Sequence, residues 1–118
     1  MTQGYIGTKQ VTAWEQEKDG KEGYAVKYED GYISWSPKET FEKSYIPIGH
    51  VQSLPPFHQR IIGEIAQLED KIGKLESFVH SDKINMLPHN DQALLIAQLQ
   101  AMHTYSTIIT LREFNLNN

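Results

Sequence analysis

The sequence predicts an α+β protein: a small N-terminal antiparallel β unit with a short helix, followed by a long C-terminal antiparallel helical hairpin that oligomerises. Two observations carry this prediction. Short segments rich in Tyr, Trp and Val, separated by turn residues, fill the first third of the chain, whereas the last half holds two long segments with helical apolar periodicity. We therefore divide the 118 residues into a β module (1–46), a linker (47–56) and a helical hairpin (57–118).

Extended segments joined by turns make up the β module. A first extended segment is expected around Tyr5 and Ile6 and over residues 11–14, and a charged loop containing two glycines follows it. Asp30-Gly31 predicts a tight hairpin turn into a further strand. Between the two turns, apolar residues alternate at the strand period, which indicates one packed face formed by Tyr24, Val26 and Tyr28.

A short helix is expected directly after the sheet. Ser36 can cap it, Pro37 suits its first position, and Glu39 can complete a capping box. Phe41 and Tyr45 would then lie on one helical face against the sheet. The aromatic residues of this module are better explained as the core of a tiny domain than as a binding platform.

The first long helix is expected over residues 57–79, after a linker rich in proline and glycine. Pro55 and Pro56 can occupy the approach and the first turn at little cost. Within the helix, apolar residues recur at alternating steps of four and three, which is the spacing of a helix that buries one seam. The residues of this seam are Ile61, Ile65, Leu68, Ile72, Leu75 and Val79.

The face opposite the seam suggests a close approach by another molecule. It carries a narrow stripe formed by Gly63, Ala66, Asp70 and Gly73. Beside the stripe lie the polar residues Arg60, Gln67, Lys71 and Lys74. Each helical glycine costs about 1 kcal/mol relative to alanine, so two on one stripe favour contact with another helix or a flat ligand. The alternative is a solvated face on which Asp70 and Lys74 form an i,i+4 ion pair.

The second long helix is expected over residues 91–114, after a connection without an element of its own and with His89 or Asn90 as its cap. One apolar stripe of this helix contains Leu95, Leu99, Met102 and Ile109. A neighbouring stripe contains Leu94, Ala101, Tyr105 and Ile108. Two stripes exceed what a two-helix hairpin can bury, so we expect a homo-oligomer built on helix–helix contacts.

Composition excludes several classes of function. The net charge of −4 argues against a nucleic-acid polymer as partner, although a small nucleotide needs only a few placed cations. Cysteine is absent, which removes disulfides, thiolate metal sites and cysteine nucleophiles. The five histidines lack metal-ligand spacing, and the common catalytic motifs are missing. We therefore expect a soluble, cytoplasmic protein that is not an enzyme and that needs neither a metal nor a cofactor.

Candidate binding residues lie on the hairpin, and each has a structural alternative. Arg112 in the last turn of the second helix either interacts with the helix dipole or clamps a phosphate where subunits meet. Tyr105 either fills an interface or stacks on a base. His58 opens the first helix, whose free N–H groups favour anions, but the two prolines before it remove donors. The residues alone indicate a helical oligomer with small polar clefts.

The C-terminal half resembles a phage helical-hairpin family. The matching residues are His58, Gln59, Arg60, Glu64, residues 68–71, Lys74, Leu75, Phe78, Leu94, Leu95, Gln98, Met102, Tyr105, Ser106 and Arg112. This family includes the anti-CBASS sponge proteins, which are compact hexamers that hold cyclic di- and trinucleotide immune messengers between subunits without cleaving them. Related anti-Thoeris sponges hold a signal of the cyclic ADP-ribose type. The present sequence departs from the family pattern at Glu113-Phe114, directly after Arg112.

The resemblance implies a non-enzymatic phage protein that sequesters a cyclic nucleotide messenger in the cytoplasm of a bacterial host. Arg60, Lys74 and Arg112 would then meet phosphates, and Tyr105 or His58 would meet a base or ribose. The N-terminal half resembles a module found at the N-termini of phage proteins, to which no activity is attached. The alternative function is an accessory protein that oligomerises through its hairpin and grips a host or phage protein with its β module.

Overall fold

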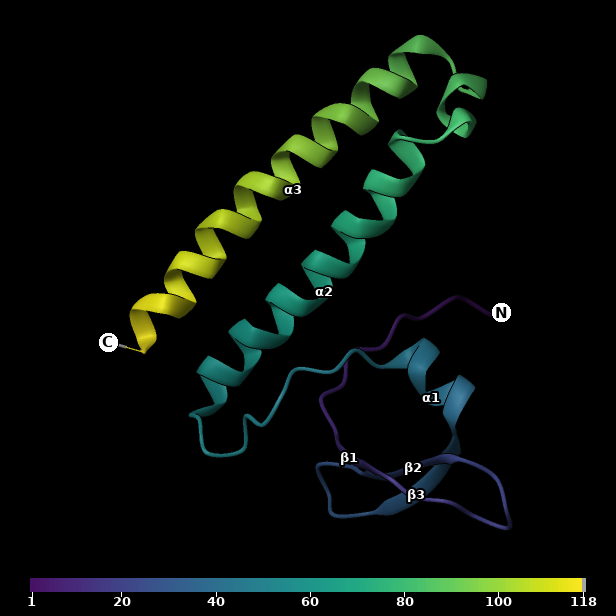
Figure 1. The fold of residues 1–118 in the computed structure, drawn as a ribbon, viewed down its shortest axis with the longest axis vertical. Coiled ribbons are helices and arrows are strands. Elements are labelled where there is room, and N and C mark those ends of the chain that lie inside the picture. Colours follow the sequence, from purple (N-terminus) through teal and green to yellow (C-terminus); the bar gives the residue numbers. More distant parts are fainter. Residues whose placement is uncertain (118) are drawn as a thin grey trace. The chain divides into compact units, whose positions relative to one another are not determined.

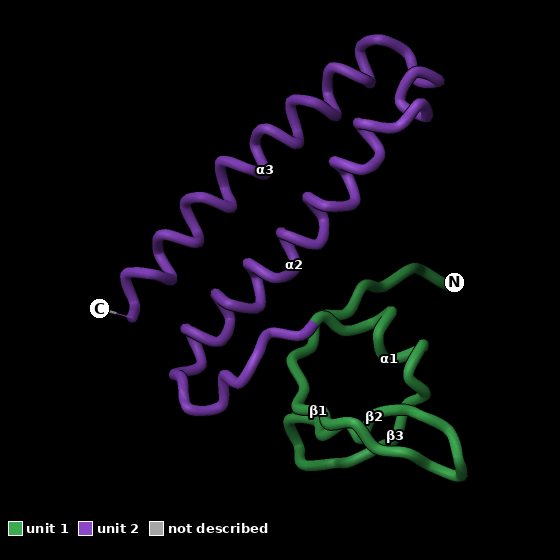
Figure 2. Tube along the Cα trace, in the orientation of Figure 1, with its two compact units in different colours: residues 1–46 green, residues 47–118 purple. Residues whose placement is uncertain are grey.

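The computed structural model describes residues 1–117, which form three β-strands, three α-helices and one 3₁₀ helix (Figure 1). They fall into two compact units, Met1–Ile46 and Pro47–Asn118 (Figure 2). The first unit contains the sheet and a short helix, and the second contains two long helices. The predicted α+β class is therefore confirmed.

The first unit is built on an antiparallel sheet with strand order β1-β2-β3. Its strands are β1 (Thr12–Glu15), β2 (Gly23–Lys27) and β3 (Ile33–Pro37). Asp19 and Gly20 both have positive φ, 52° and 78°, which suits the tight turn between β1 and β2. The predicted turn at Asp30-Gly31 joins β2 to β3, and only Gly31 takes a positive φ, 90°.

The first strand is shorter than the sequence indicates. Tyr5 and Ile6 are exposed and lie outside any strand, so their assignment to the first extended segment is wrong. The reason is the length of the partner strand. Thr12 already pairs with Lys27, the last residue of β2, so no strand remains to pair with earlier residues.

The short helix α1 (Lys38–Ser44) begins without the predicted capping box. Ser36 lies in β3 opposite Tyr24, Pro37 takes the N-cap position, and no side chain caps the helix. Pairing of β3 with β2 through Pro37 thus holds Ser36 in extended backbone and excludes the capping role. The helix does face the sheet, because the ring of Phe41 stacks 4.2 Å from that of Tyr24 on β2.

The second unit is a helical hairpin of α2 (Pro56–Val79) and α3 (His89–Leu116). Its buried core joins the two helices and consists of Leu68, Ile72, Leu99 and Ile109. Partly buried side chains packed against this core are Ile61, Ile65, Leu75, Val79 and Met102. The predicted seam of the first long helix is thus confirmed in full.

Both long helices begin with the same arrangement, which at α3 takes the place of the predicted cap. Pro55 and Pro88 are the N-cap residues, and neither helix start has a side-chain cap. Gln59 donates instead from Nε2 to the Leu54 carbonyl at 2.8 Å, and Gln92 donates in the same way to the Leu87 carbonyl at 2.8 Å. A repeated Leu-Pro-x-x-x-Gln pattern marks both starts.

The connection between the long helices differs from its prediction in two ways. It contains a 3₁₀ helix, η1 (Asp82–Met86), whose start is capped by Ser81 and whose Ile84 is buried. His89 and Asn90 lie inside the first turn of α3, so neither is its cap. Pro88 takes the N-cap position instead, and α3 begins at His89, two residues before the expected start at residue 91. The fixed φ of proline suits the backbone at a helix start.

Candidate functional site

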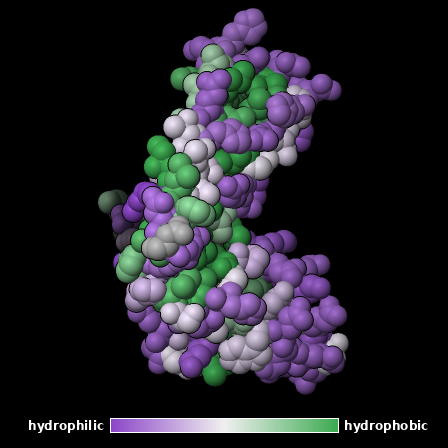
Figure 3. All heavy atoms as spheres, turned by 60° about the vertical axis from the view of Figure 1, so that its left-hand side comes forward, coloured by the Kyte–Doolittle hydropathy of each residue, from purple (hydrophilic) through white to green (hydrophobic). Residues whose placement is uncertain are grey.

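The outer surface of the hairpin carries an uncovered apolar stripe along α3. Leu94, Tyr105 and Ile108 are exposed, whereas Ile109 on the facing stripe is completely buried. Figure 3 shows hydrophobic side chains reaching the surface of the hairpin between polar ones. The two stripes expected from the sequence therefore separate into one that packs on α2 and one that nothing in the described chain covers.

The three candidate cations all lie exposed on the hairpin. Lys74 Nζ lies 2.9 Å from Asp70 Oδ2, which is the i,i+4 pair that the structural alternative describes. Arg60 and Arg112 take part in no ion pair among residues 1–117. A guanidinium that is not already paired is available for a phosphate, so these two arginines are the better-placed candidates.

His58 lies inside the hairpin. His58 is only 4% exposed. Its Nε2 lies 3.5 Å from Glu113 Oε2 on α3 but forms no hydrogen bond. The position follows from the seam, because His58 precedes Ile61 by three residues and so shares the buried face of α2. In a single chain this side chain contacts the end of α3 rather than solvent.

Two further polar contacts join the long helices, and the sequence analysis missed both. Ser106 donates from Oγ to Glu69 Oε1 at 2.9 Å. His103 Nε2 lies 2.6 Å from Glu76 Oε1. Together with the contact between His58 and Glu113, these contacts define which residues of α3 lie opposite which residues of α2. Extending the apolar spacing of α3 would have found part of this set, since Ser106 and Glu113 continue the series that contains Leu99, Met102 and Ile109.

The two glycines on the opposite face of α2 have open space beside them. A Cβ built on Gly63 or Gly73 would meet no atom within 4 Å. The close approach that these glycines suggest therefore has no source in the described residues of a single chain. The stripe is therefore open to contact with a ligand or with another protein chain.

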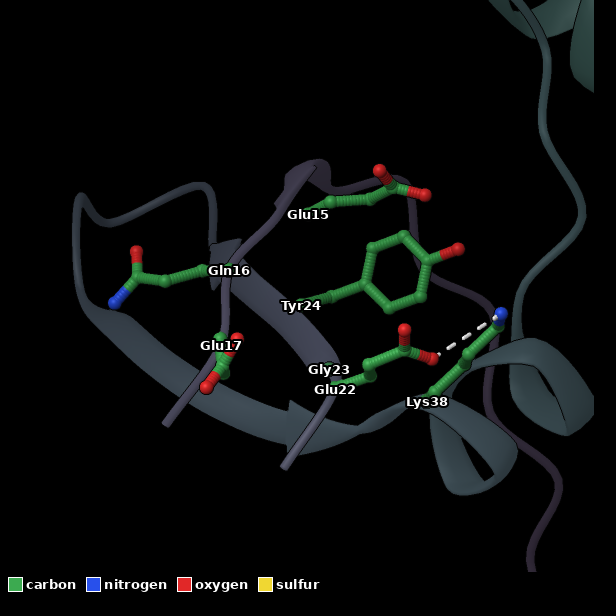
Figure 4. Close-up of a pocket in the computed structure, with 7 residues that line it drawn as sticks. All are labelled: Glu15, Gln16, Glu17, Glu22, Gly23, Tyr24 and Lys38. Carbon is green, nitrogen blue, oxygen red and sulfur yellow. Dashed lines mark ion pairs between the residues drawn. The ribbon is translucent and has the colours of Figure 1, made fainter. Parts of the chain in front are cut away.

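A pocket in the first unit has the wrong charge for a nucleotide (Figure 4). Its volume is about 190 Å³, and its lining includes three carboxylates, Glu15, Glu17 and Glu22, but only one ammonium, Lys38. Lys38 Nζ is itself 3.6 Å from Glu22 Oε2, as the dashed line in Figure 4 marks. A phosphate would meet net negative charge there, so the hairpin remains the better candidate.

The aromatic residues beside this pocket belong to the packing of the unit. Tyr24 donates from its hydroxyl to Glu42 Oε2 at 2.7 Å, and this bond raises the pKa of the tyrosine because it stabilises the neutral phenol. Phe41 stacks between Tyr24 and Tyr45, with ring centroids 4.2 and 4.8 Å apart. The interpretation of the module's aromatic residues as core is consistent with these contacts for Tyr24, Phe41 and Tyr45. It is wrong for Tyr32, which is 65% exposed.

Features of two other functional classes are absent from the described residues. No helix within residues 1–117 combines the length and the apolar character that crossing a membrane requires. No group of three or more His, Asp or Glu side chains in that range is arranged to hold a metal ion.

Comparison with known proteins identifies the hairpin. The model of the Sequestin family matches residues 55–113, half of the chain, which includes α2, η1 and most of α3. No curated protein and no solved structure matches the chain. The family name suggests a sequestering role without catalysis, and no enzyme family is indicated. This chain is therefore a member of the Sequestin family, and its helical hairpin is the part that the family describes.

Proposed function

We propose that this protein is a phage anti-defence protein that binds a cyclic nucleotide immune messenger and holds it without cleaving it. The observation that carries the proposal is the match of the Sequestin family to the hairpin, the same unit that bears the exposed cations and Tyr105. The ligand is a cyclic di- or trinucleotide or a cyclic ADP-ribose isomer. The protein acts in the cytoplasm of the bacterial host.

The proposed site lies between hairpins of different copies of the chain. Arg60, Lys74 and Arg112 point outward from one hairpin, and the uncovered stripe of α3 gives a second hairpin a surface on which to pack. Tyr105 and Arg112 are seven residues apart on α3, which places them on one face about 10 Å apart along the axis. That separation suits one residue contacting a base and the other a phosphate of the same cyclic nucleotide.

The roles within this site follow from exposure and charge. Arg112 and Arg60 bind phosphate, and Lys74 adds charge while it exchanges Asp70 for the ligand. Tyr105 stacks on a base. His58 is 4% exposed, so we assign it a positioning role: it lies against Glu113, the neighbour of Arg112, and does not itself contact the ligand. The assembly is a homo-oligomer, and a hexamer is the state that the resemblance implies.

Calorimetric titration tests the proposal. The purified protein is titrated with a panel of cyclic di- and trinucleotides and cyclic ADP-ribose isomers, and the ligand recovered afterwards is checked for cleavage by chromatography. We expect tight binding of at least one member and recovery of intact ligand. Arg112→Ala should weaken that binding roughly tenfold to a hundredfold, the loss typical of a hydrogen bond to a charged group.

The control and the contrary outcomes are specific. Lys83→Ala removes an exposed cation from η1, away from the proposed site, and should leave affinity unchanged. Binding of no member of the panel, or recovery of hydrolysed ligand, would contradict the proposal. Full affinity in folded, assembled Arg112→Ala and Lys74→Ala proteins would show that the assigned residues are wrong even if a ligand binds.

A second function, protein binding by the β unit, is favoured by one observation. Trp14, Tyr32 and Ile33 are large apolar residues that remain exposed on a unit of only 46 residues. Exposed apolar groups of this kind often mark an interaction surface. The Sequestin match does not extend to this unit, so the two functions would occupy separate parts of the chain.

A further inference from the structure

One face of the β-sheet is not covered by α1. The register places Trp14, Ala25 and Trp35 in one row across the three strands. Their side chains point away from the face that carries Tyr24, which α1 covers through Phe41, because successive residues of a strand point to opposite faces. Ala25 is nevertheless buried, since its small side chain lies between two indoles. This row of the uncovered face is apolar, whereas the neighbouring row carries Thr12 and Lys27 beside Ile33.

The two tryptophans on this face have already satisfied their polar atoms. Trp35 donates from Nε1 to the Gln16 carbonyl at 2.7 Å, and Trp14 donates from Nε1 to Gln16 Oε1 at 3.3 Å. A Cβ on Gly23 would lie 2.4 Å from the ring of Trp35, so this indole lies flat across β2 at a position that only glycine allows. The rings are held in place and present carbon to their surroundings.

A groove runs over this face beside β3. Its volume is about 470 Å³, and it is lined by Gln16, Lys18, Ala25, Tyr32, Ile33, Ser34 and Trp35. Tyr32 and Ile33 are 65% and 53% exposed, which is high for large apolar residues. Lys18, whose Nζ lies 5.7 Å from the centre of the Trp35 ring, is the one charged residue in the lining. In a chain with 15 acidic residues, this groove has no carboxylate.

The strand beside the groove is an edge of the sheet. β3 pairs with β2 on one side only. The Tyr28 amide donates to the Tyr32 carbonyl, so the backbone groups of Tyr32 face β2. Because this direction alternates along a strand, those of Ser34 also face β2, whereas the N–H groups of Ile33 and Trp35 point outward from the sheet. Ile33 and Trp35, whose backbone groups point outward, thus also line the groove with their side chains.

We propose that an extended segment of another protein, which turns apolar side chains and one acidic side chain to the groove, pairs with β3 as a fourth strand. Its backbone bonds to the outward groups of Ile33 and Trp35, its apolar side chains fill the groove, and an acidic side chain meets Lys18. This is the strand-addition mode of peptide recognition, in which backbone bonds supply affinity and side-chain contacts supply specificity. The inference is independent of the messenger-binding proposal for the hairpin.

Charge decides between this occupant and two others. The exposed first ten residues of the chain could pair with β3 of another copy, but they contain Lys9 and no acidic residue. A single-stranded nucleic acid could stack on the aromatic rings, but one lysine neutralises too little phosphate charge on a protein of net charge −4. An acidic and apolar peptide satisfies both the lysine and the carbon surface.

Fluorescence anisotropy and hydrogen exchange on the full chain test the inference. The probe is a labelled seven-residue peptide (the Glu/Val peptide) in which every second residue is Val except for one terminal Glu, so that Val and Glu point to the same face, with Ser at the positions between them. The comparison probes are the same peptide with Lys for Glu (the Lys/Val peptide), the same peptide with Ser for Val (the Glu/Ser peptide) and an oligouridine. We expect the Glu/Val peptide to bind at least about tenfold more tightly than the others, because it alone offers both contacts. Its binding should slow amide exchange over residues 32–36 and leave residues 12–16 unchanged.

Variants at matched positions sharpen the test. Ile33→Pro removes one outward N–H and should weaken binding about tenfold, whereas Ala13→Pro makes the same change on the outer edge of β1 and should leave it unchanged. Lys18→Ser should weaken binding about threefold, with Lys21→Ser, the bridge partner of Lys18, as its control. Ile33→Ser removes the apolar side chain but keeps the backbone N–H. It should also weaken binding, and it tests the inference even if Ile33→Pro disturbs the sheet.

Three results would overturn the inference. One is unchanged exchange over residues 32–36 at millimolar Glu/Val peptide. Another is equal or tighter binding of the Lys/Val peptide or of the oligouridine. The third is equal loss of binding in the Ala13→Pro and Ile33→Pro proteins, with both sheets intact by circular dichroism. Messenger binding by the hairpin is measured in the same preparations, so failure of one proposal is distinguishable from failure of the other.

Discussion

Gly73 lowers the stability of the helix in the single chain, and no contact within that chain requires a glycine there. It lies inside α2, exposed, and a methyl group added there would touch nothing. Alanine restricts the unfolded backbone more than glycine does and leaves less helical backbone open to water. Selection for stability of the isolated hairpin alone would therefore favour alanine at this position.

Gly73→Ala should raise the free energy of unfolding by about 1 kcal/mol, as measured by urea denaturation. Gly20→Ala is the matched control, because Gly20 has a φ of 78° and its replacement should destabilise the protein instead. If a second subunit or a ligand touches α2 at Gly73, the same Gly73→Ala protein should also assemble or bind more weakly. A loss of stability in the Gly73→Ala protein would contradict the open space beside this glycine.

Single residues also show where sequence patterns reach their limit. Ser36 matches a capping box by residue type, yet strand pairing with Tyr24 takes precedence, and the sequence does not state which of the two wins. His58 is the opposite case, because its spacing from Ile61 already placed it on the buried seam. Its interpretation as a ligand contact used residue type and position near a helix start and gave too little weight to periodicity.

At the scale of the element, α3 has two apolar faces with different roles. The face containing Leu99, Met102 and Ile109 packs on α2, and the face containing Tyr105 and Ile108 stays uncovered. Both faces were predictable, because each repeats at helical spacing. Their assignment to core and surface needed the structure, since the pattern alone gives both stripes similar weight.

Substitutions of two adjacent isoleucines test the difference between the buried face and the uncovered face of α3. Ile109 is 0% exposed, so Ile109→Ala should lower the free energy of unfolding by about 3 kcal/mol through lost burial and a cavity. Ile108 is 52% exposed, so Ile108→Ala should change it by less than about 0.5 kcal/mol when the chain is monomeric. Urea denaturation at low protein concentration gives both values.

The oligomer proposal adds a second readout to this pair. Analytical ultracentrifugation should show weaker assembly for Ile108→Ala, because the change removes apolar surface from the proposed interface. Equal loss of stability in the Ile108→Ala and Ile109→Ala proteins would show that the stripe containing Ile108 is buried in the isolated chain. Unchanged assembly of Ile108→Ala would place the interface elsewhere on the hairpin.

At the scale of the whole molecule, the two proposed binding surfaces lie on different units. The Sequestin match covers the hairpin, and the groove beside β3 lies in residues that the match does not reach. Substitutions at Arg112 and at Ile33 should therefore affect messenger and peptide binding separately. A partner bound by the β unit would then be linked to the hairpin through the chain without competing for the site proposed there.

The hairpin as a candidate site was predictable, but the relation among its residues was not. Helical spacing places Tyr105 and Arg112 on one face of α3. The position of α3 along α2 depends on contacts such as Ser106 with Glu69, which join residues 37 apart and leave no local pattern in the sequence. For a site formed between copies of the chain, the position of one hairpin along the next is equally absent from any local sequence pattern.

The three polar contacts of the hairpin enclose loops of different length, from which we expect an order of closure during folding. Glu76 and His103 are 27 residues apart, and Glu69 and Ser106 are 37 apart. His58 and Glu113 lie at the far end of the hairpin from η1 and therefore enclose the longest loop. Each doubling of loop length costs about 0.6 kcal/mol of chain entropy, so closure proceeds from η1 toward His58.

Native-state hydrogen exchange should therefore follow a gradient along the hairpin. Amides of residues 70–79 and 92–100 should exchange slowest, and those of residues 56–63 and 110–116 should open in smaller events that leave the rest folded. A single uniform protection factor along both helices would contradict this order. The end that frays first is the one carrying Arg60 and Arg112, so a ligand that bridges these arginines would act as a clasp and slow its opening.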